Sequence, residues 1–150
     1  MEVQPDFRDL LALFNKHQVE YIIVGGYALA FHGAPRYTGD IAIDIFIRPD
    51  PLNASRIMAA LDEFGFASVG LTPADFEKQN TVVQLGVPPV RIDIITALTG
   101  VSWEEAFAKR ATGQYGDLSV YYVGLEQFIS NKKATGRKKD LADVEALGEE

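Results

Sequence analysis

The sequence predicts an α/β domain in which helices flank a mixed β-sheet. Strand and helix signals follow one another irregularly, without the strict strand–helix–strand alternation that favours a doubly wound parallel sheet. Hydrophobic residues make up 47% of the 150 residues, which is enough to bury one core. The segment 40–47 alternates isoleucines with other residues, a pattern typical of a strand with one buried face. A chain of this length suits one domain over residues 1–150.

The N-terminal elements follow from apolar spacing and from glycine. A helix is expected where apolar residues recur at i, i+3, i+4 and i+7, at Phe7, Leu10, Leu11 and Phe14. The apolar run 19–24 predicts a buried strand. Gly25 and Gly26 end that strand, and a short helix over 27–31 leads into a turn over 32–35.

Caps and turns mark the elements that follow the strand 40–47. Asp50 and Pro51 begin a helix that Gly65 ends. Two strands over 81–85 and 90–95 surround a Gly-Val-Pro-Pro run and predict a hairpin. The remaining expected elements are a short helix opening at 72–75, a helix after the capping box 102–105, a strand over 118–123, and helices over 125–133 and 138–147.

Composition excludes several functional classes. The chain has no cysteine, which excludes disulfides, zinc–thiolate sites and thiol nucleophiles. Its net charge of −7 argues against a protein that coats nucleic acid. No apolar run is long enough to span a membrane, and the first residues lack the basic and apolar regions of a signal peptide. A cytoplasmic protein without a membrane partner is therefore expected.

Aspartates on one face of a strand are the first candidates for chemistry. Asp40 and Asp44 share a face of the segment 40–47, with Ala42 between them. The isoleucines on the opposite face indicate that this strand is central, with a buried back. Carboxylates on a central strand are costly unless they are solvated, paired or bound to a metal. Oxygen ligands of this kind suit Mg²⁺.

A further aspartate, Asp93, lies between apolar neighbours in the strand over 90–95. If this strand pairs with the strand over 40–47, Asp93 can approach Asp40 and contribute to the same metal site. An ion pair of Asp93 with Arg36 or Arg91 explains the residue equally well. The spacing alone does not separate these two interpretations.

Glycines and basic residues are the candidate phosphate contacts. Gly25 and Gly26 would let backbone N–H groups approach a phosphate closely, although a glycine pair alone indicates only a tight turn. Arg36 and Thr38 precede the acidic strand, and an arginine there can bind phosphate oxygens as a fork. The alternative for Arg36 is a surface loop.

The stretch 132–139 contains five cations. Lys132 and Arg137 flank the helix-breaking Gly136 and could reach a triphosphate. A cationic helix end that satisfies the helix dipole is the alternative. For Lys138 and Lys139 we prefer that alternative, with both side chains in solvent.

Together these motifs resemble those of bacterial nucleotidyltransferases of the polymerase-β-like superfamily, of the type related to the AbiEii toxin and to the minimal nucleotidyltransferases. The matching runs are 24–33, 36–41, 91–95 and 131–143. The resemblance extends over nearly the whole chain. It implies the nucleotidyltransferase fold with its mixed β-sheet, binding of an NTP, and dependence on Mg²⁺.

The resemblance also implies roles for single residues. Gly25 and Gly26 would hold the phosphates. Asp40 and Asp93 would bind the metal. The nucleotide or its phosphates would be contacted by Lys132 and Arg137.

One position departs from the family pattern, which is Asp-x-Asp at the start of the acidic strand. Here the motif reads Asp40-Ile41-Ala42, so one metal ligand is missing. In two-metal transfer the metals stabilise the attacking and leaving oxygens together, and a lost ligand costs orders of magnitude in rate. The explanations are a silenced active enzyme, a decayed homologue, or replacement by Asp44 on the same face. The other motif residues are intact, which favours silencing.

The expected function is transfer of an NMP from an NTP to RNA, such as a tRNA end, or to a protein hydroxyl. The chain could act as a toxin, with a cognate toxin or antitoxin protein as its partner. In that enzyme a carboxylate at position 42 would complete the metal site. The alternative is an inactive nucleotide-binding module, or an antitoxin-like partner that neutralises another protein.

Overall fold

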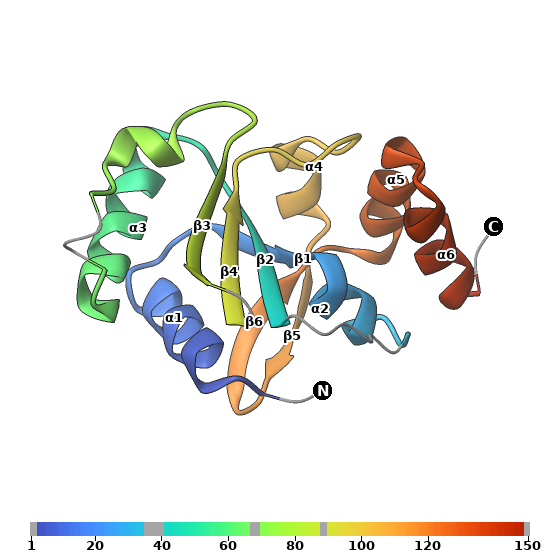
Figure 1. The fold of residues 1–150 in the computed structure, drawn as a ribbon, viewed down its shortest axis with the longest axis horizontal. Helices are drawn as coiled ribbons and strands as arrows, with labels where there is room; N and C mark the ends of the chain where they lie inside the picture. Colours follow the sequence, from blue (N-terminus) through green and yellow to red (C-terminus); the bar gives the residue numbers. More distant parts are fainter. Residues whose placement is uncertain (1–2, 35–40, 67–69, 88–89, 149–150) are drawn as a thin grey trace.

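The computed structural model describes residues 3–34, 41–66, 70–87 and 90–148, and Figure 1 shows the arrangement of the elements. The elements are α1 (Pro5–Lys16), β1 (Tyr21–Val24), α2 (Gly25–Phe31), β2 (Ile41–Ile47), α3 (Pro51–Phe64), the 3₁₀-helix η1 (Pro73–Phe76), β3 (Val82–Val87), β4 (Val90–Ile95), α4 (Trp103–Ala108), β5 (Ala111–Tyr115), β6 (Leu118–Tyr122), α5 (Leu125–Thr135) and α6 (Lys138–Ala146).

The strands form one six-stranded sheet in the order β3-β4-β2-β1-β6-β5. Neighbours β2 and β4 are parallel, as are β1 and β6, whereas the other three pairs are antiparallel. The sheet is therefore mixed, as the sequence predicts. The predicted hairpin of β3 and β4 and the interior position of β2 are confirmed as well. Strand β2 also pairs with β4, the arrangement that the sequence left open.

Helices cover both faces of the sheet. On one face, Ile43, Ile45 and Ile47 of β2 are fully buried. Helix α1 packs on this face, because the ring of Phe14 lies 5.7 Å from that of Tyr21, which pairs with Ile47 across the strands. On the other face, Trp103 of α4 packs edge-on against Phe46, with the ring centroids 5.1 Å apart.

Helix α3 lies beside α1, and Glu63 joins them through an ion pair with Lys16 and a hydrogen bond with the His17 ring. The C-terminal helices α5 and α6 form a hairpin at the end of the molecule opposite α3 (Figure 1). Among the described residues, no helix has the length and apolar character needed to cross a membrane.

Local signals in the sequence set most element boundaries. The Asp50 side chain accepts a hydrogen bond from the Asn53 N–H at 2.7 Å, and the Ser102 hydroxyl accepts one from the Glu105 N–H at 3.2 Å. These are N-caps that satisfy otherwise unpaired amides of the first turn. Gly136 ends α5 with a φ of +67°, which confirms the expected break between the last two helices.

Strand β5 is absent from the sequence prediction, which left 111–115 unassigned. Its sequence, Ala-Thr-Gly-Gln-Tyr, has no apolar run and contains a glycine, so local propensity does not mark it. Pairing with β6 along its whole length creates the strand. Strand β1 is also shorter than the apolar run 19–24, and α2 begins two residues earlier than expected, at Gly25.

Candidate functional site

On the α4 side of the sheet, three neighbouring strands, β2, β4 and β3, carry a row of polar residues. In β2, Asp44 pairs with Val24 of β1 on one side and with Asp93 of β4 on the other. Asp93 in turn pairs with Gln84 of β3. Paired residues of adjacent strands lie about 4.8 Å apart and point to the same face. The two carboxylates are therefore direct neighbours on the two strands where the sequence predicts a metal site.

Gly25 places the start of α2 directly against Asp44. Its φ is +67°, a left-handed conformation that glycine adopts without strain. A Cβ added at this position would overlap Oδ2 of Asp44 and lie 3.0 Å from its Cγ. Only glycine fits here, and the Asp44 carboxyl group is thus held between the backbone of the β1–α2 turn and Asp93. Gly26 follows, half-buried in the first turn of α2.

Arg91 forms an ion pair with Asp93, two residues further along the same face of β4. Arg91 Nη2 donates to Oδ2 of Asp93 at 3.1 Å, and Nε lies 3.0 Å from Oδ1. The second contact is close but not aligned as a hydrogen bond, since Nε and Oδ1 are buried without a hydrogen-bond partner. A buried polar atom in that condition costs about 1–3 kcal/mol. The ion-pair interpretation of Asp93 from the sequence is therefore correct, with Arg91 as the partner.

Ala42 lies one row below the two aspartates, and it pairs with Arg91 across β2 and β4. It is buried, with 6% of its surface exposed. Its face is the one that carries Asp44. The sequence resemblance places the Asp-x-Asp motif at Asp40-Ile41-Ala42. In the paired strands, the neighbouring residues of β2 on this face are Ala42 and Asp44.

Three of the sequence-predicted site residues, Arg36, Thr38 and Asp40, lie outside the described residues. Within the part of the chain that is described, no group of three or more His, Asp or Glu side chains gathers as a metal site. A pair of neighbouring carboxylates does fit Mg²⁺, which keeps several waters and is commonly bound through one or two carboxylates. The unsatisfied Oδ1 of Asp93 is a further oxygen that a cation could use.

Lys132 and Arg137 are engaged elsewhere, within the α5–α6 hairpin. Both contact Asp140, which is fully buried: Arg137 Nε donates to Oδ2 at 2.7 Å, and Lys132 Nζ lies 3.5 Å from Oδ1. Hydrogen bonds from Arg137, aided by the nearby charge of Lys132, hold the pKa of Asp140 well below its ordinary value. Asp143 completes the cluster, 3.5 Å from Lys132.

The hairpin docks on the loop that follows β4, where Asn131 donates to the Thr99 carbonyl at 2.9 Å. Among the described contacts, none joins Lys132 or Arg137 to Asp44, Arg91 or Asp93. The structure therefore brings together Gly25, Asp44 and Asp93, but not the cations of the hairpin with them. Asp140 has no predicted role from the sequence, since its burial depends on α6 folding back onto α5.

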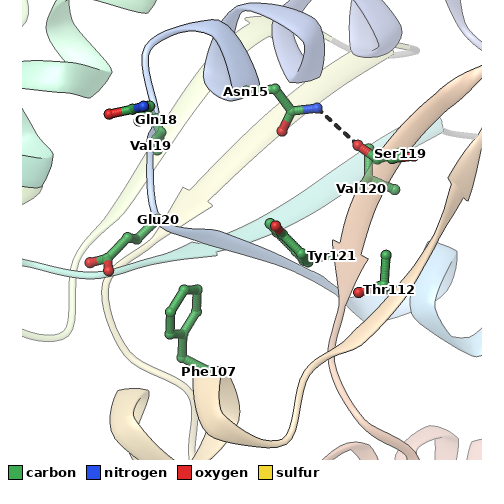
Figure 2. A pocket seen from close by; sticks show the side chains of 9 residues that line it. All are labelled: Asn15, Gln18, Val19, Glu20, Phe107, Thr112, Ser119, Val120 and Tyr121. Carbon is green, nitrogen blue, oxygen red and sulfur yellow. Dashed lines mark hydrogen bonds between the residues drawn. The ribbon is translucent and has the colours of Figure 1, made fainter.

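An open pocket of about 400 Å³ lies away from this row, between the end of α1, strands β5 and β6, and Phe107 of α4. Figure 2 shows its nine lining residues, with the hydrogen bond from Asn15 to the Ser119 carbonyl. None of the sequence-predicted site residues lines it. We therefore assign the candidate site to the row of Asp44 and Asp93.

Solved structures with the same architecture include three nucleotidyltransferase-type proteins. A provisionally assigned nucleotidyltransferase from Thermotoga maritima superposes with a TM-score of 0.59 at 15% identity, covering 98% of this chain and 93% of that one. The chain has a nucleotidyltransferase fold. The lincomycin-bound lincosamide adenylyltransferase LnuA gives a TM-score of 0.56 at 13% identity, covering 99% and 98% of the two chains.

An antigenic nucleotidyltransferase-like protein from Paracoccidioides brasiliensis gives 0.53 at 19% identity, covering 95% of this chain and 72% of the other. No protein-family model matches the sequence, and no curated protein is significantly similar to it. Because the identities are low, these comparisons establish the fold of the chain and not its activity.

Proposed function

We propose that this chain binds an NTP with Mg²⁺ at the row of Asp44 and Asp93 and transfers its NMP group to an acceptor hydroxyl. The observation that carries the proposal is the direct pairing of Asp44 with Asp93 on two interior strands, on a fold shared with nucleotidyltransferases. Mg²⁺ is commonly bound through one or two carboxylates together with substrate phosphates.

In the proposed reaction, the acceptor oxygen attacks the α-phosphorus of the NTP. The bond between the α-phosphorus and the bridging oxygen breaks, pyrophosphate leaves with that electron pair, and the acceptor proton passes to a base. Bound Mg²⁺ would offset the charge that develops on the phosphate oxygens. Asp44 and Asp93 would hold the ion, and the glycine turn at Gly25 and Gly26 would face the phosphates.

Asp44 is the replacement that the sequence left open for the missing ligand at position 42. Its pairing with Asp93 supports this assignment. Ala42, in the adjacent row, supplies neither a metal ligand nor a base for the acceptor proton. We therefore expect transfer by this chain to be slow. A carboxylate at position 42 should raise its rate.

Two kinds of similarity indicate candidate acceptors: the sequence resemblance and the structural likeness to LnuA. The sequence resemblance favours RNA, such as a tRNA end, or a protein hydroxyl, and the toxin role with a cognate antitoxin rests on that resemblance alone. The neighbour LnuA is an adenylyltransferase for lincosamide antibiotics, which adds small hydroxylated molecules to the acceptors worth assaying. Arg36, Thr38, Lys132 and Arg137 are proposed nucleotide contacts on the sequence resemblance.

A second candidate function is an inactive nucleotide-binding module or antitoxin-like partner. The specific observation that favours it is the ion pair that already occupies Asp93, together with the alanine at position 42. Such a chain would bind NTP without consuming it.

One experiment separates the two functions. The chain, Ala42→Asp and Ala42→Asp/Asp93→Asn are incubated with labelled NTPs and Mg²⁺. RNA, protein and lincosamide-type acceptors are tested in separate reactions. The enzyme proposal predicts at least about a hundredfold more label transfer for Ala42→Asp than for the chain, and its loss in the double variant. Binding of NTP by calorimetry without transfer in any variant would support the binding module.

A further inference from the structure

Arg91 lies in the row next to Asp44 and Asp93, opposite Ala42, and the proposed transfer reaction gives it no role. It lies on the same face as Asp44 and Asp93, and its side chain is 30% exposed whereas that of Asp93 is 9% exposed. Arg91 is therefore in contact with solvent, whereas the carboxylate that it binds is buried.

The ion pair is made in an incomplete form. A guanidinium and a carboxylate can form two parallel hydrogen bonds, but here only Nη2 and Oδ2 are hydrogen-bonded. Nε and Oδ1 are both buried and unsatisfied. Oδ1 contacts Nε at 3.0 Å without hydrogen-bond alignment, so this oxygen would gain from a better-placed cation.

The register of the strands places Arg91 opposite Ala42 and Asp93 opposite Asp44. A divalent cation bound between Asp44 and Asp93 would therefore compete with the guanidinium for the same Asp93 oxygens. Two cations on one buried carboxylate repel each other, so binding of the ion requires that Arg91 swing toward solvent.

We propose that Arg91 is an internal competitor of the metal: it holds Asp93 in the metal-free protein and releases it when a divalent cation binds. This inference rests on the proposed metal site. The fraction of molecules in which Asp93 is free sets the apparent affinity, which is the intrinsic affinity reduced by that fraction. Removal of the arginine then strengthens binding, whereas loss of a purely structural ion pair would weaken it or leave it unchanged.

The test is the affinity of the full chain for Mn²⁺ alone, measured by the electron paramagnetic resonance signal of the free ion. The variants are Arg91→Gln, Asp93→Asn, Arg91→Gln/Asp93→Asn, and the control Arg8→Gln. Arg8 pairs with Asp117 at 3.1 Å on the exposed side of α1, so the control removes one positive charge without touching the site.

The expected result is tighter Mn²⁺ binding by Arg91→Gln, by about tenfold or more, because Asp93 is then free in a larger fraction of the molecules. Arg8→Gln should bind as the unmodified chain does, and Arg91→Gln/Asp93→Asn should lose the gain. Equal or weaker binding by Arg91→Gln, with Asp93-dependent binding intact in the unmodified chain, would overturn the role of Arg91. Absence of Asp93-dependent binding in every variant would instead overturn the proposed metal site and the inference with it.

Discussion

Replacement of Gly25 by alanine should lower both the stability of the fold and the metal affinity of the site. The cost to stability has two parts, one from the backbone conformation and one from packing. The φ of Gly25 is +67°, and an alanine in this conformation costs about 1–2 kcal/mol. The added Cβ would also overlap Oδ2 of Asp44. Such overpacking costs a further amount of about 1–3 kcal/mol or displaces the carboxyl group.

Gly65 provides a matched control. It ends α3 with a φ of +105°, and a Cβ added there meets nothing within 4 Å. Gly65→Ala therefore includes the backbone cost without the contact with Asp44. We expect it to lower the free energy of unfolding by about 1–2 kcal/mol, against about 2–5 kcal/mol for Gly25→Ala.

The assay is urea unfolding followed by circular dichroism, with Mn²⁺ affinity measured on the same samples. Gly25→Ala should weaken metal binding and Gly65→Ala should not. In an Asp44→Ala background the excess cost of Gly25→Ala should shrink, because the overlapping oxygen is gone, and this coupling is a double-mutant cycle. Equal stability and equal metal affinity for the two glycine variants would refute the packing of Gly25 against Asp44.

The remaining predictions concern the α5–α6 hairpin. Asp140→Ala should lower the free energy of unfolding by about 1–3 kcal/mol, since it removes the buried hydrogen-bond acceptor of Arg137 and one of the two carboxylates near Lys132. Urea unfolding at neutral pH measures this. The pKa of Asp140 is lowered in the folded state, so its contribution to the free energy of unfolding is full above the unfolded pKa of about 3.9 and is lost as the pH falls further. The difference in urea midpoint between the chain and Asp140→Asn should therefore narrow between about pH 4 and about pH 2. A difference that stays constant would contradict the assignment. Lys138→Ala/Lys139→Ala should change stability by less than about 0.5 kcal/mol, because both side chains are exposed, and a larger loss would show an unrecognised structural contact.

Sequence patterning was sufficient for the fold class and for most elements. The isoleucine alternation in β2 and the caps at Asp50 and Ser102 depend on interactions within a few residues. Such interactions are visible in the chain itself. The short strand β5 was not visible, because its partner β6 supplies the hydrogen bonds that define it.

For the candidate site too, some features follow from the sequence and others only from the tertiary structure. The sequence by itself determined that acidic residues lie on one face of β2 and of β4, since side chains alternate along any strand. Only the tertiary structure decided that Asp93 pairs with Asp44, that Arg91 pairs with Ala42, and that Asp140 is buried by the folding of α6 onto α5. Register and helix docking join residues far apart in the chain, and they are fixed by how whole faces pack together rather than by any local sequence pattern.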